Sequence, residues 1–131
     1  MPYDLDDLPD EVGVFLEERH LATLTTLRAD GSPHVVAVGF TWDPEARLAR
    51  VITFAPSQKA RHLRAAPGPR AAVCQVDGGR WLTLEGTAVV TDDAERVAEA
   101  VRRYATRYRQ PGDREDRVAI EIHVDRVLGR A

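Results

Sequence analysis

The feature that most constrains this chain is a succession of β-forming runs separated by very short turns. The turns are marked by Asp30-Gly31, Asp43-Pro44-Glu45 and Asp77-Gly78-Gly79. Parallel neighbours would need a crossover of about a dozen residues between strands. The pattern therefore predicts an antiparallel sheet of six strands, at 21–27, 34–42, 48–55, 71–76, 80–90 and 118–124.

Run 34–42 is apolar at both alternating sets of positions, which is typical of a strand covered on both faces. We therefore expect it to be central in the sheet. Three helices are also predicted. The first has an apolar face of Leu8, Val12, Phe15 and Leu16, and the second spans 58–64 behind Ser57 as N-cap.

The third helix should begin at a capping box formed by Asp92 and Glu95. Its apolar residues recur at spacings of three and four, at Ala94, Val97, Ala98, Val101, Tyr104, Ala105 and Tyr108. Short turns, six strands and terminal helices together predict a mainly β protein, a single domain over 1–131, in which an antiparallel barrel carries helices at its ends or openings.

Composition argues against several classes of protein. The net charge of −3 offers no basis for binding nucleic acid, and no apolar run approaches the roughly 20 residues that span a bilayer. The acidic first ten residues do not resemble a secretory signal, so we expect a cytoplasmic location. One cysteine, Cys74, and four histidines without ligand spacing predict no metal site. No motif of a hydrolase is present.

Ser57-Gln58-Lys59 is the segment best suited to bind an anion. Free backbone N–H groups and a partial positive charge mark a helix N-terminus, and here a hydroxyl and an ammonium are added. Lys59 is the one lysine among 18 basic residues. Arg61, Arg64 and Arg70 could extend the cradle into a groove for a longer anionic tail, or could equally be solvated surface charges. The alternative is an ordinary capped surface helix with an exposed lysine.

Gln75 and Trp81 flank the turn at 77–79, so both could face a ligand at the end of a strand. A tryptophan at such a position is also a common core residue. The residues by themselves leave the two interpretations of Trp81 open.

Three stretches resemble the deazaflavin-dependent members of the pyridoxamine-phosphate-oxidase-like split barrels. They are 19–28 with 30–40, 49–53 with 57–60, and 75–78 with 80–82 and 84–86. The resemblance implies a six-stranded antiparallel split β-barrel of the FMN-binding type. It also implies a homodimer with a cofactor groove at the subunit interface.

Within that resemblance, Ser57, Gln58 and Lys59 would hold the phosphate of coenzyme F420, with Arg61 beside them. One side of the groove would be lined by His34, Val36, Val38, Ile52 and Thr53, and the second subunit would offer Gln75 and Trp81.

The implied activity is hydride transfer from reduced F420 to an organic substrate, with biliverdin or a related tetrapyrrole as the expected acceptor. Arg61 and Arg80 are candidates for the substrate's propionates, and no side chain is assigned as the catalytic proton donor. Two alternatives stay open. One is an FMN-dependent enzyme of the pyridoxamine-phosphate-oxidase type, and the other is a carrier that binds a cofactor or tetrapyrrole without turnover.

Overall fold

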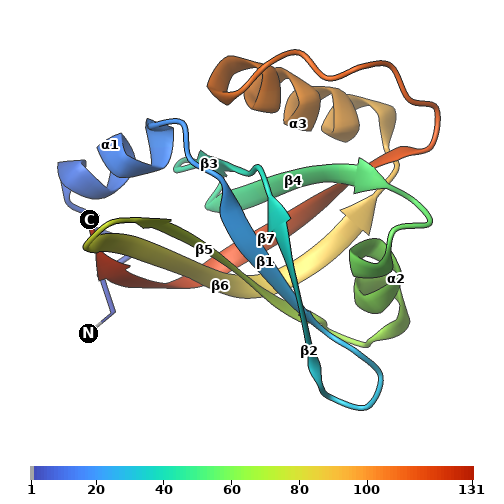
Figure 1. Cartoon of the computed structure of the whole chain (residues 1–131), viewed down its shortest axis with the longest axis horizontal. Coiled ribbons are helices and arrows are strands. Elements are labelled where there is room, and N and C mark those ends of the chain that lie inside the picture. Colours follow the sequence, from blue (N-terminus) through green and yellow to red (C-terminus); the bar gives the residue numbers. More distant parts are fainter. Residues whose placement is uncertain (1) are drawn as a thin grey trace.

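A computed structural model describes residues 2–131 as one antiparallel sheet with three helices around it (Figure 1). Along the chain the elements are α1 (Asp10–Glu17), β1 (Ala22–Leu27), β2 (Pro33–Val38), β3 (Thr41–Asp43), β4 (Leu48–Phe54), α2 (Gln58–Ala65), β5 (Arg70–Asp77), β6 (Arg80–Thr91), α3 (Ala94–Arg107) and β7 (Arg117–Arg130). Within this part of the chain no helix has the length and apolarity to cross a bilayer.

The sheet runs in the order β2-β1-β5-β6-β7-β4-β3, and every neighbouring pair is antiparallel. Its two ends, β2 and β3, are not hydrogen-bonded to each other, so the barrel stays split. The long pair β6 and β7 bends at a bulge between Glu85 and Gly86. A Cβ at Gly86 would lie 1.9 Å from the carbonyl oxygen of His123, so only glycine permits this close approach. The predicted antiparallel, mainly β architecture is confirmed.

The prediction of a single central strand over 34–42 is wrong. The run divides at Gly39 into β2 and β3, which gives seven strands, and β2 is an edge. The backbone N–H of Phe40 donates to the Tyr108 hydroxyl, and the carbonyl of Phe40 accepts from Arg107. Side chains of α3 thus satisfy backbone groups that a continuous strand would have paired with its neighbour.

Helices α1 and α2 close opposite ends of the barrel (Figure 1). The predicted face of α1 is confirmed, because Val12, Phe15 and Leu16 are buried in the core and Leu8 packs against it. Helix α2 begins behind Ser57, as expected, and buries Ala60 and Leu63. Its contacts are with β1 and β6.

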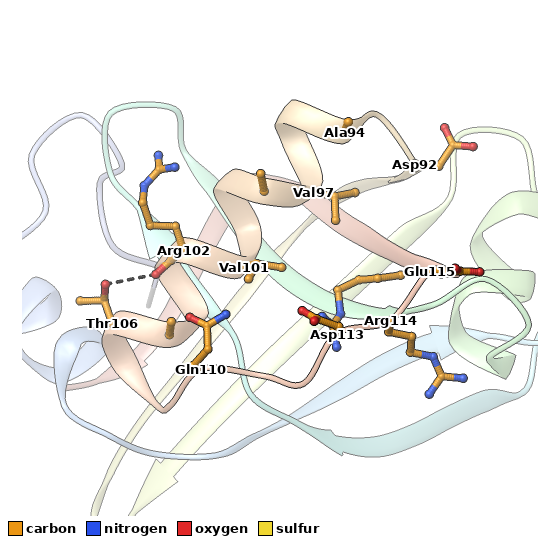
Figure 2. Close-up of a pocket in the computed structure, with 13 residues that line it drawn as sticks. Asp92, Ala94, Val97, Val101, Arg102, Thr106, Gln110, Asp113, Arg114 and Glu115 are labelled. Carbon is orange, nitrogen blue, oxygen red and sulfur yellow. Dashed lines mark hydrogen bonds between the residues drawn. The ribbon is translucent and has the colours of Figure 1, made fainter.

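Helix α3 differs from the prediction in its N-cap. Its N-cap is Asp93, whose carboxylate accepts from the N–H of Arg96, and not Asp92. Of its side chains, Ala100 is the buried one. Much of the predicted apolar stripe, including Val97 and Val101, lines a groove of about 880 Å³ between the helix and the polar loop after it (Figure 2).

The face of α3 toward the barrel is polar and aromatic instead. Arg107 donates to the carbonyls of Glu18 and Phe40 and to the side-chain oxygen of Gln75, at 2.5–3.0 Å. The Tyr108 hydroxyl donates to the carbonyl of His20 at 2.6 Å. These two residues join the ends of α1 and β2, the start of β1, and β5.

Arg107→Ala should destabilise the fold by about 2–4 kcal/mol, because buried acceptors left unpaired cost about 1–3 kcal/mol each. Urea unfolding followed by circular dichroism measures this. Arg109→Ala removes an exposed arginine two residues away and should change the free energy of unfolding by less than about 0.5 kcal/mol. Equal losses in the two variants would show that Arg107 has no special structural role.

Candidate functional site

The start of α2 has the properties of an anion cradle. The Ser57 hydroxyl is buried, and its oxygen accepts from the N–H of Ala60 at 3.3 Å. Because the oxygen acts as the acceptor in this bond, its own O–H proton is still free to be donated. Within residues 2–131 the backbone N–H groups of Gln58 and Lys59 donate to no other group. Two aligned amides therefore point out of the first turn of a capped helix.

Lys59 is half-buried and forms no ion pair with an acid in the described chain. Burial lowers the pKa of its ammonium. Its Nζ lies 6.0 Å from the centre of the Phe54 ring, and the guanidinium of Arg114 lies 4.0 Å from the same ring. Arg114, which is also paired with Asp116, was missed by sequence reasoning because it comes from a loop 55 residues farther along the chain.

The edge strand β2 presents His34, Val36 and Val38 on its inner face, where they alternate with exposed residues. The His34 Nδ1 is buried and has no hydrogen-bond partner within residues 2–131. The ring of His34 meets that of His62 edge-on, with centroids 5.0 Å apart. The inner column of β2, which consists of His34, Val36 and Val38, therefore meets α2 at the contact between His34 and His62.

His62 was not singled out by the sequence, since it has no motif around it. Its Nδ1 is hydrogen-bonded to the hydroxyl of Thr26 at 3.0 Å, on the strand next to β2. Burial, followed by the positive charges of His34, Arg28 and Arg61, lowers its pKa. Arg61 itself is exposed and lines a cavity between α2 and the turn of the β1–β2 hairpin.

Ile52 and Thr53 are consecutive strand residues, so their side chains point to opposite faces of β4. Thr53 lies with Val51 on the core face and is nearly buried, whereas Ile52 is half-buried on the other face. A ligand in the opening can therefore contact one of these two side chains directly, and it can meet the other only through the backbone of the strand. Strand β3 pairs with Leu48–Arg50 and leaves the rest of that edge uncovered.

Gln75, Arg80 and Trp81 lie at the other end of the barrel from α2, around the β5–β6 turn (Figure 1). Within one chain they are not brought to the Ser57–Lys59 cradle. Gln75 is fully buried, and its amide is bonded to Phe15 and Arg107, so it has no exposed atom for a ligand. Trp81 is exposed.

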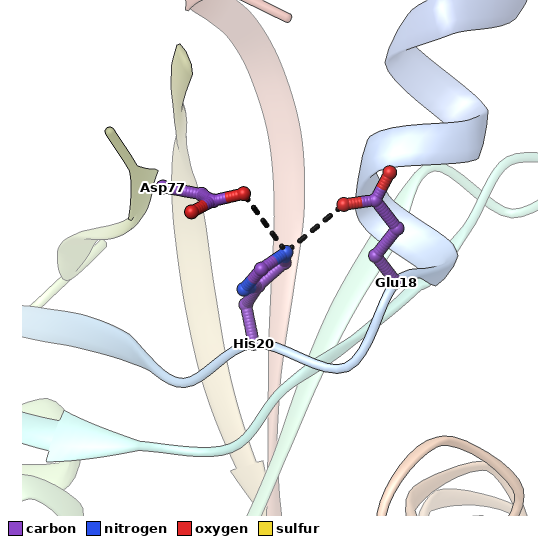
Figure 3. Close-up of side chains that lie close together, drawn as sticks. All are labelled: Glu18, His20 and Asp77. Carbon is purple, nitrogen blue, oxygen red and sulfur yellow. Dashed lines mark hydrogen bonds and ion pairs between the residues drawn. The ribbon is translucent and has the colours of Figure 1, made fainter. Parts of the chain in front are cut away.

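Arg80 is engaged in an ion-pair cluster. Its guanidinium donates to Glu18 at 2.9 and 3.2 Å and to Asp77 at 2.5 Å. The His20 ring lies between the same two carboxylates (Figure 3). Although Glu18, His20 and Asp77 are close enough to share a metal ion, the Arg80 guanidinium is already hydrogen-bonded to both carboxylates. The cluster is best described as a surface ion-pair network.

The hydrogen bond from Arg80, and then that from His20, lowers the pKa of Glu18 from 4.5 to about 2. A carboxyl group with a lowered pKa stabilises the fold above its ordinary pKa, and that stabilisation is lost as the pH falls from 4.5 toward 2. Arg80→Gln should therefore lower the Tm near neutral pH, and most of the difference from wild type should be lost as the pH falls to about 2. Solvent screening keeps the effect small.

Thermal unfolding followed across this pH range measures the effect. Arg19→Gln is the control, because Arg19 is an exposed neighbour that forms no ion pair in the described chain. A difference in Tm that persists unchanged at low pH would mean that Glu18 is not the group responsible.

Comparison with known proteins places this geometry in a family. The family model described as pyridoxamine 5'-phosphate oxidase matches residues 8–131. An F420H(2)-dependent biliverdin reductase from Mycobacterium tuberculosis (strain CDC 1551 / Oshkosh) is 56% identical over 124 residues, which cover 95% of this chain and 89% of the relative.

Two solved structures are also similar. A conserved hypothetical protein from Mycobacterium tuberculosis has a TM-score of 0.79 at 25% identity, with 95% of this chain and 84% of that chain covered. An F420 reductase has a TM-score of 0.74 at 27% identity, with 92% and 98% covered. The chain therefore belongs to the pyridoxamine 5'-phosphate oxidase family.

Proposed function

We propose that this protein is a reductase that uses coenzyme F420 and transfers a hydride from it to an organic acceptor. The observation that carries the proposal is the cradle at the start of α2, where two free backbone N–H groups adjoin an ammonium with no acid partner. The relative at 56% identity is named for dependence on F420H(2), and one structural neighbour is named an F420 reductase.

The residues present fit such a cofactor. Ser57, Gln58 and Lys59 would bind its phosphate through a hydroxyl, two amides and an ammonium. His34, Val36 and Val38 would line the adjoining opening, and the unpaired His34 Nδ1 offers a polar atom for orienting a ring. When bound, F420 supplies a hydride from its deazaflavin ring.

The chain's own task is then to position the reactants and to exclude water. The accompanying proton must reach the acceptor from bound water or from a side chain at the opening. Among the three residues on the inner face of β2, His34 is the one whose side chain carries an N–H group. We propose biliverdin or a related linear tetrapyrrole as the acceptor, since biliverdin is named in the activity of the 56% relative.

We further propose that two chains form a homodimer with the groove at their interface. The outer face of β2-β1-β5-β6 is unusually apolar, with Leu21, Leu27, Val35, Val76 and Trp81 exposed. Because Trp81 and the cradle lie at opposite ends of one chain, a second subunit is the natural source of Trp81 at the groove (Figure 1).

A FMN-dependent enzyme is the second candidate. The family to which the chain belongs carries the description pyridoxamine 5'-phosphate oxidase, and the same cradle suits the phosphate of either cofactor.

Lys59→Ala should weaken binding of oxidised F420 by about tenfold to a hundredfold, the usual effect of losing one charge-assisted hydrogen bond. Fluorescence titration measures the affinity, and the return of oxidised F420 absorbance in the presence of biliverdin measures turnover. Arg109→Ala, which removes an exposed arginine beyond the end of α3, is the control and should leave both unchanged. Binding of FMN without binding of F420 would favour the second candidate.

Val35→Asp should convert a dimer of twice 14.5 kDa into a monomer, because a carboxylate would be buried in an apolar interface. Sedimentation velocity distinguishes the two states. Val14→Asp is a matched control, since Val14 and Val35 are both 58% exposed but Val14 lies on α1. A monomeric wild type, or dissociation of both variants alike, would contradict the proposed interface.

A further inference from the structure

A cavity of about 600 Å³ lies between the turn of the β1–β2 hairpin and the second half of α2. Much of its lining is apolar and small, with Leu27 and Ala29 on the hairpin and Ala65 on the helix. Two arginines also line it, Arg28 from the hairpin and Arg61 from the helix. The volume is in the range of pockets that bind small organic molecules.

Every formal charge in the lining is positive. Within the described chain Arg61 forms no ion pair, and the guanidinium of Arg28 donates to the carbonyl of Pro33 at 2.6 Å. Asp30 belongs to the same turn but not to the lining, and its carboxylate accepts from the N–H and hydroxyl of Ser32. The hydrogen bond to Pro33 holds Arg28 in place before a ligand arrives, which reduces the entropic cost of binding.

His62 forms part of the same wall. The groups facing it are His34 from β2, Arg28 from the hairpin and Arg61 from α2, and all three oppose its protonation. The hydroxyl of Thr26 holds its Nδ1. The cavity therefore combines an apolar floor with an excess of positive charge, and an organic anion would relieve that excess.

We propose that this cavity binds the carboxylate of an apolar organic molecule, and, resting on the proposed function, that the carboxylate is a propionate of the tetrapyrrole acceptor. The apolar floor distinguishes this from a site for a small inorganic anion, which would gain nothing from Leu27 and Ala65. Arg61 thereby keeps the role that the sequence suggested for it, and Arg28 takes the place of Arg80, which is committed to Glu18 and Asp77.

The position of the cavity suits an acceptor that reacts at the neighbouring opening. Arg61 and His62 lie on the same eight-residue helix whose first turn forms the phosphate cradle. At about 1.5 Å per residue, His62 is about 6 Å along the axis from Gln58. An extended, conjugated molecule can therefore place a side chain in the cavity while its body lies in the opening beside β2.

The test compares biliverdin with its dimethyl ester, which has the same ring system but no carboxylates. Binding to the full-length protein without cofactor is followed by quenching of tryptophan fluorescence. Wild type should bind the acid at least about tenfold more tightly than the ester, and the double variant Arg28→Gln/Arg61→Gln should lose this preference. Arg109→Gln, which removes an exposed arginine outside the lining, should retain it.

The preference should also grow as the pH falls through the titration of His62, because a bound carboxylate favours its protonated form. His62→Asn should remove that pH dependence without abolishing binding. Equal affinities for acid and ester, or an equal effect of Arg109→Gln, would overturn the proposal.

Two further outcomes separate this site from the function on which it rests. If the double variant loses affinity for oxidised F420 and keeps its preference for biliverdin over the dimethyl ester, the cavity belongs to the cofactor and the proposal fails. If wild type binds the acid in this cavity but never oxidises reduced F420, the proposed activity fails and the carboxylate site stands.

Discussion

The hydrogen bonds made by Arg107 and Tyr108 at the end of α3 are the constraint on which the barrel's shape depends. These side chains donate to the backbone carbonyls of Glu18, His20 and Phe40, which lie at points where the chain leaves regular structure. By pairing these groups, Arg107 and Tyr108 permit the apolar run 34–42 to break at Gly39. The break makes β2 an edge, and the edge in turn creates the split that a ligand can enter.

The distribution of charge separates structural arginines from those available to a ligand. Arg80 and Arg107 are bonded to several acceptors of the chain itself and hold segments together. Around α2 the situation is reversed, because Lys59 and Arg61 have no acidic partner in the described residues. Positive charge that the fold leaves uncompensated favours anions, and here it lies beside the opening of the barrel.

Much of the architecture could be predicted from periodicity and turns. The alternation in 118–124, the N-cap at Ser57 and the apolar face of α1 depend on neighbouring residues, and local interactions decide them. Predictions that depended on distant partners were less successful. The apolar spacing of α3 gave no sign that Arg96 would pair with Glu121 and Arg103 with Asp43. Periodicity does not reveal that polar residues will find partners across 25 residues or more.

The sequence by itself determined an antiparallel β fold with three helices and a capped helix start suited to an anion, because turn chemistry, side-chain alternation and capping are encoded locally. Only the tertiary structure decided that β2 is an edge, that Gln75 is buried, and that Arg80 is already paired. It also decided that His34 meets His62 and that Arg28 and Arg61 line one cavity. These contacts join residues more than 25 positions apart, and their energies depend on burial and distance, which no local pattern records.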